Sequence, residues 1–251
     1  TPICKNGLVP ININGEERGI RLNRIHIEED AGKSLHDIDE NYTSIDLNRA
    51  GVPLLEIVSE PDLHSSDEAF AYITELRKLV TWLGICDGNM EEGSMRCDAN
   101  ISIRLKGETK LGTRVEVKNL NSIRNVKRAI DVEVGRLVDL VENNQPIVQE
   151  TRSYDADNNF TFSLRSKEDA DDYRYFPEPD LTPFHVTDEY LAEIKNGMPV
   201  LPNALKNRYI NHLQLSDYDA SVLCDDKEQS IYFEEVIKHT TNYKAVANWM
   251  L

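Results

Sequence analysis

The chain has 251 residues, 44 acidic and 28 basic side chains, a formal net charge of −16 and 40% apolar residues. This composition excludes wholesale disorder, and no apolar run reaches the ~18 residues of a membrane span. Four scattered cysteines without a C-x-x-C pair argue against a disulfide framework or a cysteine zinc site, and the acidity argues against a general basic platform for nucleic acid.

The first 30 residues are predicted to form strands. Apolar residues alternate up to Ile13 and resume from Ile20, on either side of the polar turn Asn14-Gly15-Glu16, which is a hairpin signal. Around Asn23 the alternation slips by one residue, as it does at a β-bulge. The polar stretch 31–48 is predicted to be a loop.

A short strand and a helix are predicted next. Pro53 precedes the apolar run 54–58, which fits a strand. Ser65 and Glu68 form a capping box at the start of a helix, since a Glu three residues after a Ser N-cap is its signature. Gly84 is predicted to end this helix.

A hairpin and a second helix follow. Residues 93–105 and 113–118 alternate between apolar and polar side chains, and a turn centred on Glu108 separates them. A helical apolar stripe covers about 122–142. The order of strands, helix, hairpin and helix predicts the α+β class with an antiparallel sheet.

The region around 198–202 contains two prolines in the run Met198-Pro199-Val200-Leu201-Pro202, which favours a domain boundary. Amphipathic helices are predicted near 203–213 and 228–239. We therefore expect one domain at 1–198 and a small helical domain at 199–251.

The predicted hairpin brings four polar side chains together. If the turn centres on Glu108, Asn100 opposes Glu116 and Asp98 opposes Lys118, all on one face of the sheet. Two carboxylates, an amide and a lysine would suit Mg²⁺ and a polyphosphate. A solvated sheet face is the alternative interpretation.

Three further carboxylates are candidate ligands. Glu56 interrupts an apolar strand, and burying it unpaired would cost several kcal/mol, so it needs a metal, a hydrogen-bond network or a partner such as Arg49. Glu28 and Glu29 end a strand and either add ligands or are solvated. His26 shares the strand face of Glu28, but the sequence has no zinc-binding histidine spacing.

Basic side chains gather where the second helix starts, and a helix N-terminus offers free N–H groups to phosphate. The group comprises Lys118, Arg124, Lys127 and Arg128. The alternative is an ordinary basic helix face. Arg174, between two tyrosines, is predicted either to contact a phosphate or base or to pack on the tyrosines.

Long motifs identify a family resemblance that runs in order through essentially the whole chain. They are His26-Ile-Glu-Glu-Asp-Ala-Gly-Lys33, Asp46-Leu-Asn-Arg-Ala-Gly-Val-Pro-Leu-Leu-Glu-Ile-Val-Ser-Glu-Pro-Asp62, Met90-Glu-Glu-Gly-Ser-Met-Arg-Cys-Asp-Ala-Asn100, Glu116-Val-Lys-Asn-Leu-Asn-Ser122 and Asp171-Asp-Tyr-Arg-Tyr-Phe-Pro-Glu-Pro-Asp180. With these motifs the chain resembles the GatB family, the B subunits of tRNA-dependent amidotransferases.

The resemblance implies a cradle-shaped catalytic domain related to glutamine synthetase, followed by a helical domain. It implies a carbon–nitrogen ligase that uses ATP and Mg²⁺ to convert Glu-tRNA(Gln) or Asp-tRNA(Asn) to the amide. The glutaminase subunit, GatA, would supply the ammonia, and GatC would clasp the GatA–GatB pair. The scattered cysteines fit a cytoplasmic location in a reducing cytosol, with an organelle matrix as the alternative, and no membrane or DNA partner is expected.

Matched motif by motif, the resemblance implies Mg²⁺ ligands and a nucleotide site. The implied metal ligands are Glu28 or Glu29, Glu56, Asp98 and Glu116, of which the last three are also the candidate catalytic residues. The candidate nucleotide-binding residues are Arg96, Lys118, Asn119, Ser122 and Arg174.

Two family segments are absent from this sequence, namely the N-terminal strand with its Glu-x-His pair and the tail domain that grips tRNA. We therefore expect a fragment that is inactive alone. Two alternatives stay open. One is the archaeal GatE type, which makes only Gln-tRNA(Gln), and the other is a non-catalytic acidic scaffold that docks the glutaminase and tRNA.

Overall fold

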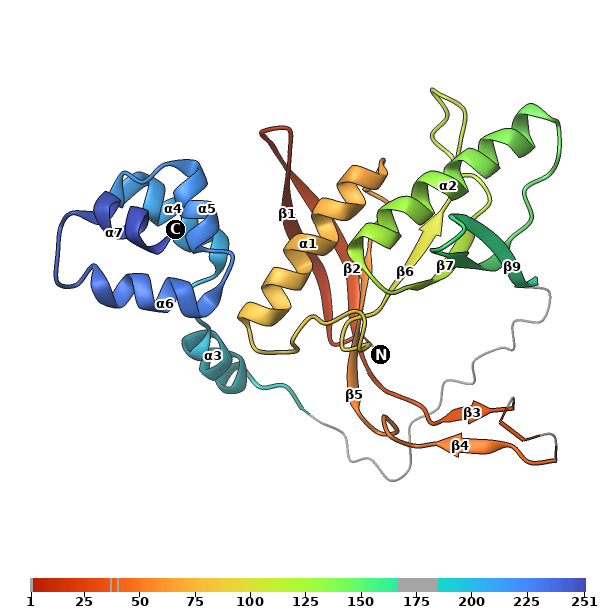
Figure 1. Ribbon diagram of the computed structural model, residues 1–251, viewed down its shortest axis with the longest axis horizontal. Coiled ribbons are helices and arrows are strands. Elements are labelled where there is room, and N and C mark those ends of the chain that lie inside the picture. The colour runs from red at the N-terminus through yellow and green to blue at the C-terminus, as the bar shows by residue number, and fades with distance from the viewer. Residues whose placement is uncertain (1, 37, 40, 167–184) are drawn as a thin grey trace. The chain divides into compact units, whose positions relative to one another are not determined.

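The computed structural model describes residues 2–36, 38–39, 41–166 and 185–251 (Figure 1). The chain divides into two compact units, residues 1–75 and residues 76–251, here called the N-terminal and C-terminal units. Helices and sheets with antiparallel strand pairs confirm the predicted α+β class. In the described part of the chain, no helix is both long and apolar enough to cross a membrane.

The N-terminal unit is built on a three-stranded antiparallel sheet in the order β1-β2-β5. Its strands are β1 (Cys4–Ile13), β2 (Glu16–Glu29) and β5 (Pro53–Ser59). Asn14 and Gly15 have φ values of 53° and 87°, as the tight hairpin turn requires. The predicted bulge is present, because the β2–β5 register shifts between Leu22 and Arg24.

Residues 31–48 differ from the predicted loop. They contain a small antiparallel pair, β3 (Lys33–Leu35) and β4 (Ser44–Asp46). These strands have only three residues each, so their alternation is too short to be recognised from a polar sequence.

Helix α1 (Ser66–Trp82) begins as the capping box predicts. The Glu68 N–H donates to Ser65 Oγ at 3.1 Å, while the Glu68 carboxylate accepts from the His64 N–H at 2.6 Å and pairs with Arg18 of β2. Gly84 follows the helix at φ 69°, as predicted. The contacts of Glu68 therefore tie the start of α1 to the N-terminal sheet.

The C-terminal unit contains a four-stranded sheet in the order β6-β7-β8-β9. Its strands are β6 (Cys97–Ile101), β7 (Val115–Leu120), β8 (Glu150–Asp155) and β9 (Phe160–Ser166). Strand β6 is shorter than the predicted 93–105, because pairing with β7 ends at Ile101 opposite Val115. Strands β8 and β9 were not predicted.

The sheet is mixed rather than purely antiparallel, since β7 and β8 run parallel. Helix α2 (Ile123–Glu142) makes the crossover between them, as a parallel pair requires, and it packs on the sheet (Figure 1). Val126, Ala129 and Leu137 of α2 are buried, together with Val115 and Val117 of β7. This apolar layer occupies one face of the sheet and leaves the other to polar side chains.

The end of the chain is helical. Its helices are α3 (Asp188–Gly197), α4 (Pro202–Leu213), α5 (Asp217–Leu223), α6 (Lys227–Val236) and α7 (Tyr243–Met250). Helices α4 and α6 were predicted, whereas α3, α5 and α7 are short segments that their periodicity did not reveal. Tyr209, Leu223 and Phe233 form the centre of a buried cluster that also includes Trp82 of α1.

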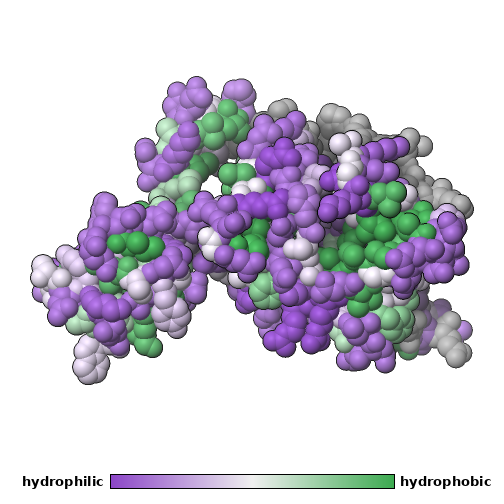
Figure 2. All heavy atoms as spheres, turned by 90° about the horizontal axis from the view of Figure 1, so that it is seen from above, coloured by the Kyte–Doolittle hydropathy of each residue, from purple (hydrophilic) through white to green (hydrophobic). Residues whose placement is uncertain are grey.

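Polar residues cover much of the face seen in Figure 2, with apolar residues gathered in separate patches. This pattern agrees with a composition in which 29% of residues are charged. All four cysteines are free thiols, in agreement with the absence of a predicted disulfide framework.

One carboxylate lies inside the apolar layer between α2 and the sheet. Glu133 is completely buried and accepts from Arg136 Nε at 3.1 Å and from Thr161 Oγ1 at 2.7 Å. Arg152 lies 3.5 Å from Glu133 and donates to Glu150 at 2.7 Å. A buried charge is tolerated only with such partners, so this network fixes α2 on β8 and β9.

We expect Glu133→Ala to reduce the free energy of unfolding by about 3 kcal/mol, because Arg136 and the buried Thr161 hydroxyl would lose their acceptor and a cavity would remain under α2. Urea unfolding followed by far-UV circular dichroism measures the change. Glu142→Ala, at an exposed position of the same helix, is the matched control and should change stability by less than about 0.5 kcal/mol. Equal losses in the two variants would contradict this role for Glu133.

Candidate functional site

Three charged residues meet on the polar face of the C-terminal sheet. Asn100 pairs with Glu116 across β6 and β7, as the predicted register requires. The predicted register does not extend to Asp98, because the pairing shifts between Cys97 and Ala99, and Asp98 is not a ladder partner of Lys118. Lys118 forms an ion pair with Asp98, and its Nζ lies 3.3 Å from Glu116 Oε1. We call Asp98, Glu116 and Lys118 the acid–lysine cluster.

The next strand supports this cluster. Thr151 of β8 is buried and donates its hydroxyl to Glu116 Oε2 at 3.0 Å. The Glu116 side chain is 18% exposed, whereas Asp98 is 45% exposed. Glu116 is therefore held in place by Thr151, and Asp98 lies open to solvent.

The charge of Lys118 is stable in this setting. Partial burial opposes it, but hydrogen bonding and attraction from Asp98 and Glu116 outweigh that effect and raise the pKa of Lys118. The lysine is therefore protonated at neutral pH and offsets part of the repulsion between the two carboxylates. A divalent cation on the carboxylates would free the ammonium for an anionic ligand.

The cysteine beside the cluster is unsuited to nucleophilic chemistry. Burial, reinforced by the negative charge of Asp98, raises the pKa of the Cys97 thiol to about 12. The thiolate, rather than the thiol, is the reactive form. The chemistry of this face therefore belongs to the carboxylates and the lysine.

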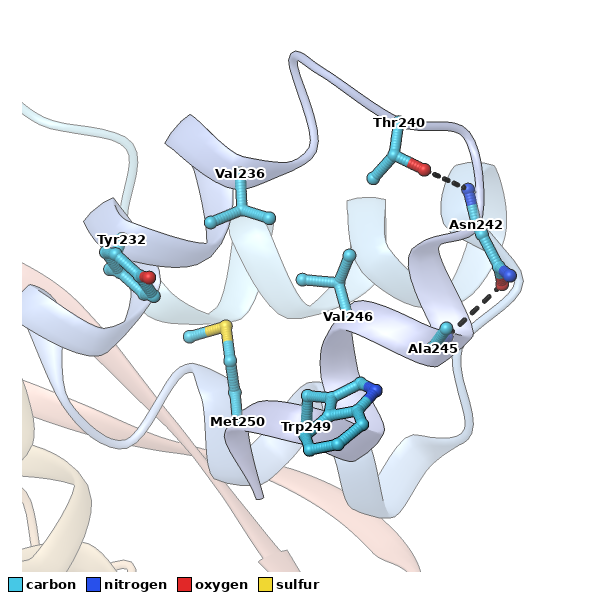
Figure 3. Close-up of a pocket in the computed structure, with 8 residues that line it drawn as sticks. All are labelled: Tyr232, Val236, Thr240, Asn242, Ala245, Val246, Trp249 and Met250. Carbon is cyan, nitrogen blue, oxygen red and sulfur yellow. Dashed lines mark hydrogen bonds between the residues drawn. The ribbon is translucent and has the colours of Figure 1, made fainter.

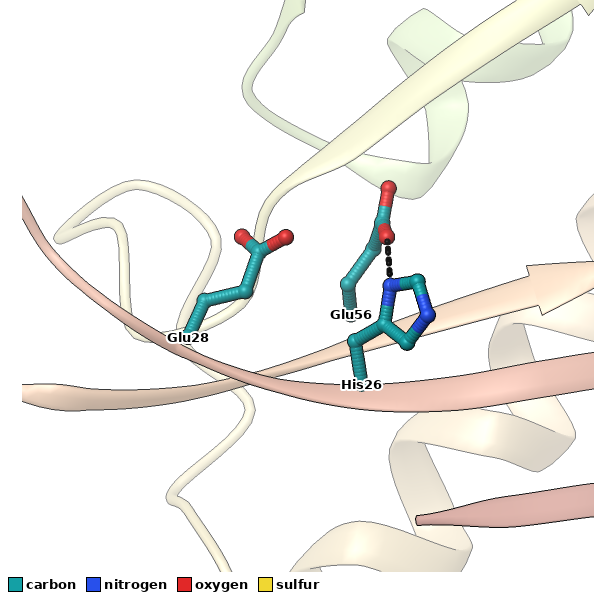
Figure 4. Close-up of side chains that lie close together, drawn as sticks. All are labelled: His26, Glu28 and Glu56. Carbon is teal, nitrogen blue, oxygen red and sulfur yellow. Dashed lines mark hydrogen bonds and ion pairs between the residues drawn. The ribbon is translucent and has the colours of Figure 1, made fainter. Parts of the chain in front are cut away.

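The N-terminal unit holds a second cluster, made of His26 and Glu28 on β2 and Glu56 on β5 (Figure 4). His26 and Glu56 are cross-strand partners, and His26 Nδ1 lies 3.2 Å from Glu56 Oε2. Each residue offers one ligand atom, and these atoms lie within 4.8 Å of one another. A ring nitrogen with two carboxylate oxygens fits a divalent cation. We call this group the histidine–glutamate cluster.

The pairing of β2 with β5 explains why sequence reasoning missed His26 as a member. His26 and Glu56 are 30 positions apart in the chain, and they meet only because their strands pair. A search for short histidine spacings therefore does not detect this group. Glu28 belongs to the group, whereas Glu29 lies opposite Pro53 and outside it. The cross-strand register, and not a local motif, assembles this donor set.

Glu56 is not the buried carboxylate that its apolar strand predicts. Its side chain is 47% exposed, and none of the β5 residues is fully buried. The suggested partner Arg49 donates instead to Asp30 Oδ2 at 2.7 Å. Glu56 is therefore held by His26 rather than by an arginine.

The candidate nucleotide-binding residues lie in different settings. Asn119 has a φ of 65° and its side-chain amide donates to the Tyr154 carbonyl at 3.4 Å. Ser122 is the N-cap of α2, since its Oγ accepts from the Asn125 N–H at 3.1 Å. Arg96 directly precedes β6. Arg174 lies outside the described residues.

A hollow between α6 and α7 has a different chemical character (Figure 3). Its walls are mostly apolar and include Val236, Val246, Trp249 and Met250. Asn242 in its wall caps α7 by accepting from the Ala245 N–H at 3.3 Å. Among the described residues, no carboxylate or basic side chain lines this hollow, so metal–phosphate chemistry has no support there.

Comparisons with known proteins point to one family. A family model described as the GatB/GatE catalytic domain matches residues 1–192. Proteins named as the B subunit of aspartyl/glutamyl-tRNA(Asn/Gln) amidotransferase are 50% identical in Oleidesulfovibrio alaskensis over 250 residues and 52% identical in Pseudomonas putida over 251 residues. The match covers all of this chain and 52% of each relative, so the chain spans about half the length of these curated relatives.

Both clusters lie within the 192 residues that the family model matches. The five quoted motifs lie in the same range, and they include Glu56, Asp98 and Glu116. The family model covers most of the chain, and about half of the residues are identical to those of the named B subunits. The chain belongs to the GatB/GatE catalytic domain family.

Proposed function

We propose that this chain is the catalytic part of a GatB-type amidotransferase that amidates Glu or Asp esterified to tRNA(Gln) or tRNA(Asn) in an ATP-dependent reaction. The proposal also includes the cradle-shaped fold related to glutamine synthetase and an assembly with the glutaminase GatA and with GatC. The main support is the acid–lysine cluster, which lies in a segment about half identical to proteins named as the B subunit of such an enzyme.

The proposed reaction has two steps. First, the side-chain carboxylate of the misacylated tRNA attacks the γ-phosphorus of ATP; the bond from that phosphorus to the bridging oxygen breaks, and ADP leaves. Second, the ammonia nitrogen attacks the carbonyl carbon of the acyl phosphate, and the carbon–oxygen bond to phosphate breaks. The nitrogen loses one proton, which the departing phosphate takes up, so the products are the amide and hydrogen phosphate. Glutamine hydrolysis in GatA supplies the ammonia.

The physical problem of the first step is the approach of two anions. Lys118 contributes a positive charge that its neighbours stabilise, so it can bind the phosphate oxygens and lower this repulsion. Thr151 orients Glu116 by donating a hydrogen bond to it, which keeps one carboxylate oxygen in a fixed position. Arg96, next to β6, is proposed as a second positive group.

The carboxylates are proposed to hold Mg²⁺. Glu28 and Glu56 with His26 in one unit, and Asp98 and Glu116 in the other, offer the oxygen-rich donor sets that hard cations prefer. Bound Mg²⁺ would supply positive charge to the phosphates of ATP. The residues of the chain would hold the ion, keep Lys118 protonated and position Glu116.

The alternatives differ in the role that they give to these residues. A GatE-type protein would share the chemistry but use only Glu-tRNA(Gln), and the names of the relatives cited above favour the GatB type. A non-catalytic scaffold would show no link between the carboxylates and ATP. The ion pairing of Asp98 with Lys118 supports the catalytic interpretation, because a lysine suited to phosphate lies beside carboxylates that are proposed to hold Mg²⁺.

Asp98→Asn in the full-length complex should reduce ATP-dependent amidation by at least about 100-fold, because the variant loses a charged ligand where phosphate charge is stabilised. Basal glutaminase activity should stay within about twofold of wild type. Separate assays of ammonia release from glutamine and of amide formation on tRNA measure the two activities.

Asp131→Asn is the matched control for this experiment, since Asp131 is an exposed aspartate on α2 in the same unit. This variant should retain both activities. Wild-type amidation in Asp98→Asn would identify the polar sheet face as a solvated surface and remove the basis for the proposed site.

Glu56→Gln should weaken Mn²⁺ binding by the full-length chain at least about tenfold, since one of three donor groups loses its charge. Mn²⁺ is a spectroscopic substitute for Mg²⁺, and electron paramagnetic resonance titration counts the free ion directly. His26→Ala should weaken the same binding.

Glu29→Gln is the control, because Glu29 is the neighbour of Glu28 but lies outside the histidine–glutamate cluster. Its Mn²⁺ affinity should match wild type. A larger loss in Glu29→Gln than in Glu28→Gln would assign the ligand role to Glu29 and refute the donor set described above.

A further inference from the structure

Strand β7 contains a β-bulge. The ladder pairs Ala99 with Val117 and then Cys97 with Leu120, so β7 has two residues where β6 has one. An extra residue of this kind bends the strand and changes the direction of the side chains next to it. Bulges are frequent beside functional sites, and this one lies within the segment that carries the acid–lysine cluster.

The extra residue is accommodated by an unusual backbone conformation at Asn119. Its φ is 65°, in the left-handed region, which is unfavourable for most side chains and is tolerated best by glycine, asparagine and aspartate. Asn119 is exposed, and its side-chain amide donates to the Tyr154 carbonyl of β8 at 3.4 Å. The left-handed residue is therefore the point at which β7 leaves regular alternation.

The bulge explains how β7 can bury Leu120 and still hold Lys118 on the polar face. Val117 and Leu120 are both buried, although regular alternation would place residues three positions apart on opposite faces. Lys118 lies between them and forms ion pairs with Asp98 and Glu116. The left-handed conformation at residue 119 lets the strand return Leu120 to the core while Lys118 stays with its partners.

Loss of this conformation would displace the lysine. If residue 119 took an ordinary strand conformation, Leu120 would turn to the polar face. Burial of a leucine stabilises a protein more than a partly exposed ion pair does, so the core would keep Leu120 and Lys118 would shift instead. The backbone of Asn119 therefore controls where the ammonium of Lys118 lies.

We propose that Asn119 is a positioning residue for Lys118, which acts through its left-handed backbone and not through contact with a ligand. This inference rests on the proposed function, since the position of Lys118 matters to the reaction only if its charge takes part in amidation. It replaces the nucleotide contact that the family resemblance implies for Asn119 with a role in the geometry of β7.

Asn119→Val in the full-length complex should lower kcat for ATP-dependent amidation about tenfold or more, because a β-branched residue disfavours the left-handed region and a small displacement of a charged group is enough for such a loss. Asn119→Gly should stay within about threefold of wild type, since glycine adopts this conformation freely. Basal glutaminase activity should be unchanged in both variants. Separate assays of ammonia release and of amide formation at saturating ATP measure these effects.

Asn144→Val is the matched control, because Asn144 is also exposed and left-handed, with a φ of 55°, and follows α2 outside both clusters. It should lose stability as Asn119→Val does and keep its amidation activity. An equal loss of amidation in Asn144→Val would attribute the effect to instability and refute the positioning role. If Asn119→Val fails to fold, Asn119→Ala replaces it, since alanine lacks the β-branch but is still disfavoured there; its kcat should lie at least about threefold below that of Asn119→Gly.

The effect of residue 119 should disappear when the lysine is absent. In a Lys118→Ala background, Asn119→Val should change the residual amidation by less than about twofold, because two residues that act through one group do not have additive effects. Additive losses in the double variant would show that Asn119 acts by another route and would overturn the proposal.

The outcomes separate this inference from the proposed function. If the wild-type complex forms no amide with ATP, or if Lys118→Ala keeps wild-type amidation, the proposed function of this site fails. If Lys118→Ala is impaired but Asn119→Val is not, the positioning role is wrong while the proposed function stands. Equal losses in Asn119→Val and Asn119→Gly would assign the role to the amide side chain and overturn the backbone role.

Discussion

The register between β6 and β7 is the constraint on which the candidate site depends. Ala99, Ile101, Val115 and Val117 bury one face of this pair under the apolar layer of α2. A slip of one residue would turn these side chains to solvent and the charged ones into the core, so burial holds the register from Ala99 to Ile101. The register shifts only between Cys97 and Ala99, at the start of β6. The opposite face then carries Asp98, Glu116 and Lys118 as a direct consequence. The packing of the apolar core thus fixes the positions of these three charged side chains, although they lie on the opposite face of the sheet.

The carboxylates of this acidic chain are clustered at a few places. With a net charge of −16, the protein places carboxylates close together in both clusters. Lys118 forms ion pairs with Asp98 and Glu116, and His26 contacts Glu56. These two groups lie exposed or half-buried, where a cation can reach them. Glu133 is different, because its carboxylate is completely buried and its role is structural.

The parallel step between β7 and β8 extends the polar face beyond the predicted hairpin. Because α2 crosses over the sheet, β8 returns beside β7 and brings Thr151 next to Glu116. Strand β9 then pairs Phe162 with Ser153 of β8. The predicted hairpin face had two carboxylates and a lysine, and the four-stranded sheet adds hydroxyl and aromatic side chains beside them.

Local patterns in the sequence determined the hairpin of β1 and β2 with its bulge, the capped start of α1, the span of α2 and the pairing of Asn100 with Glu116. Each depends on alternation, helical spacing or a turn residue within a short window, where neighbouring residues decide the conformation. The sequence also carried the motifs of the family.

Only the tertiary structure decided the contacts between distant segments. It paired His26 with Glu56, exposed Glu56, assigned Arg49 to Asp30 and set Ser153 between Lys118 and Phe162. Strands β8 and β9 lack clear alternation, because Arg152 and Thr161 are polar residues that face inward to the buried Glu133. Such positions are set by partners far along the chain, and no local window contains that information.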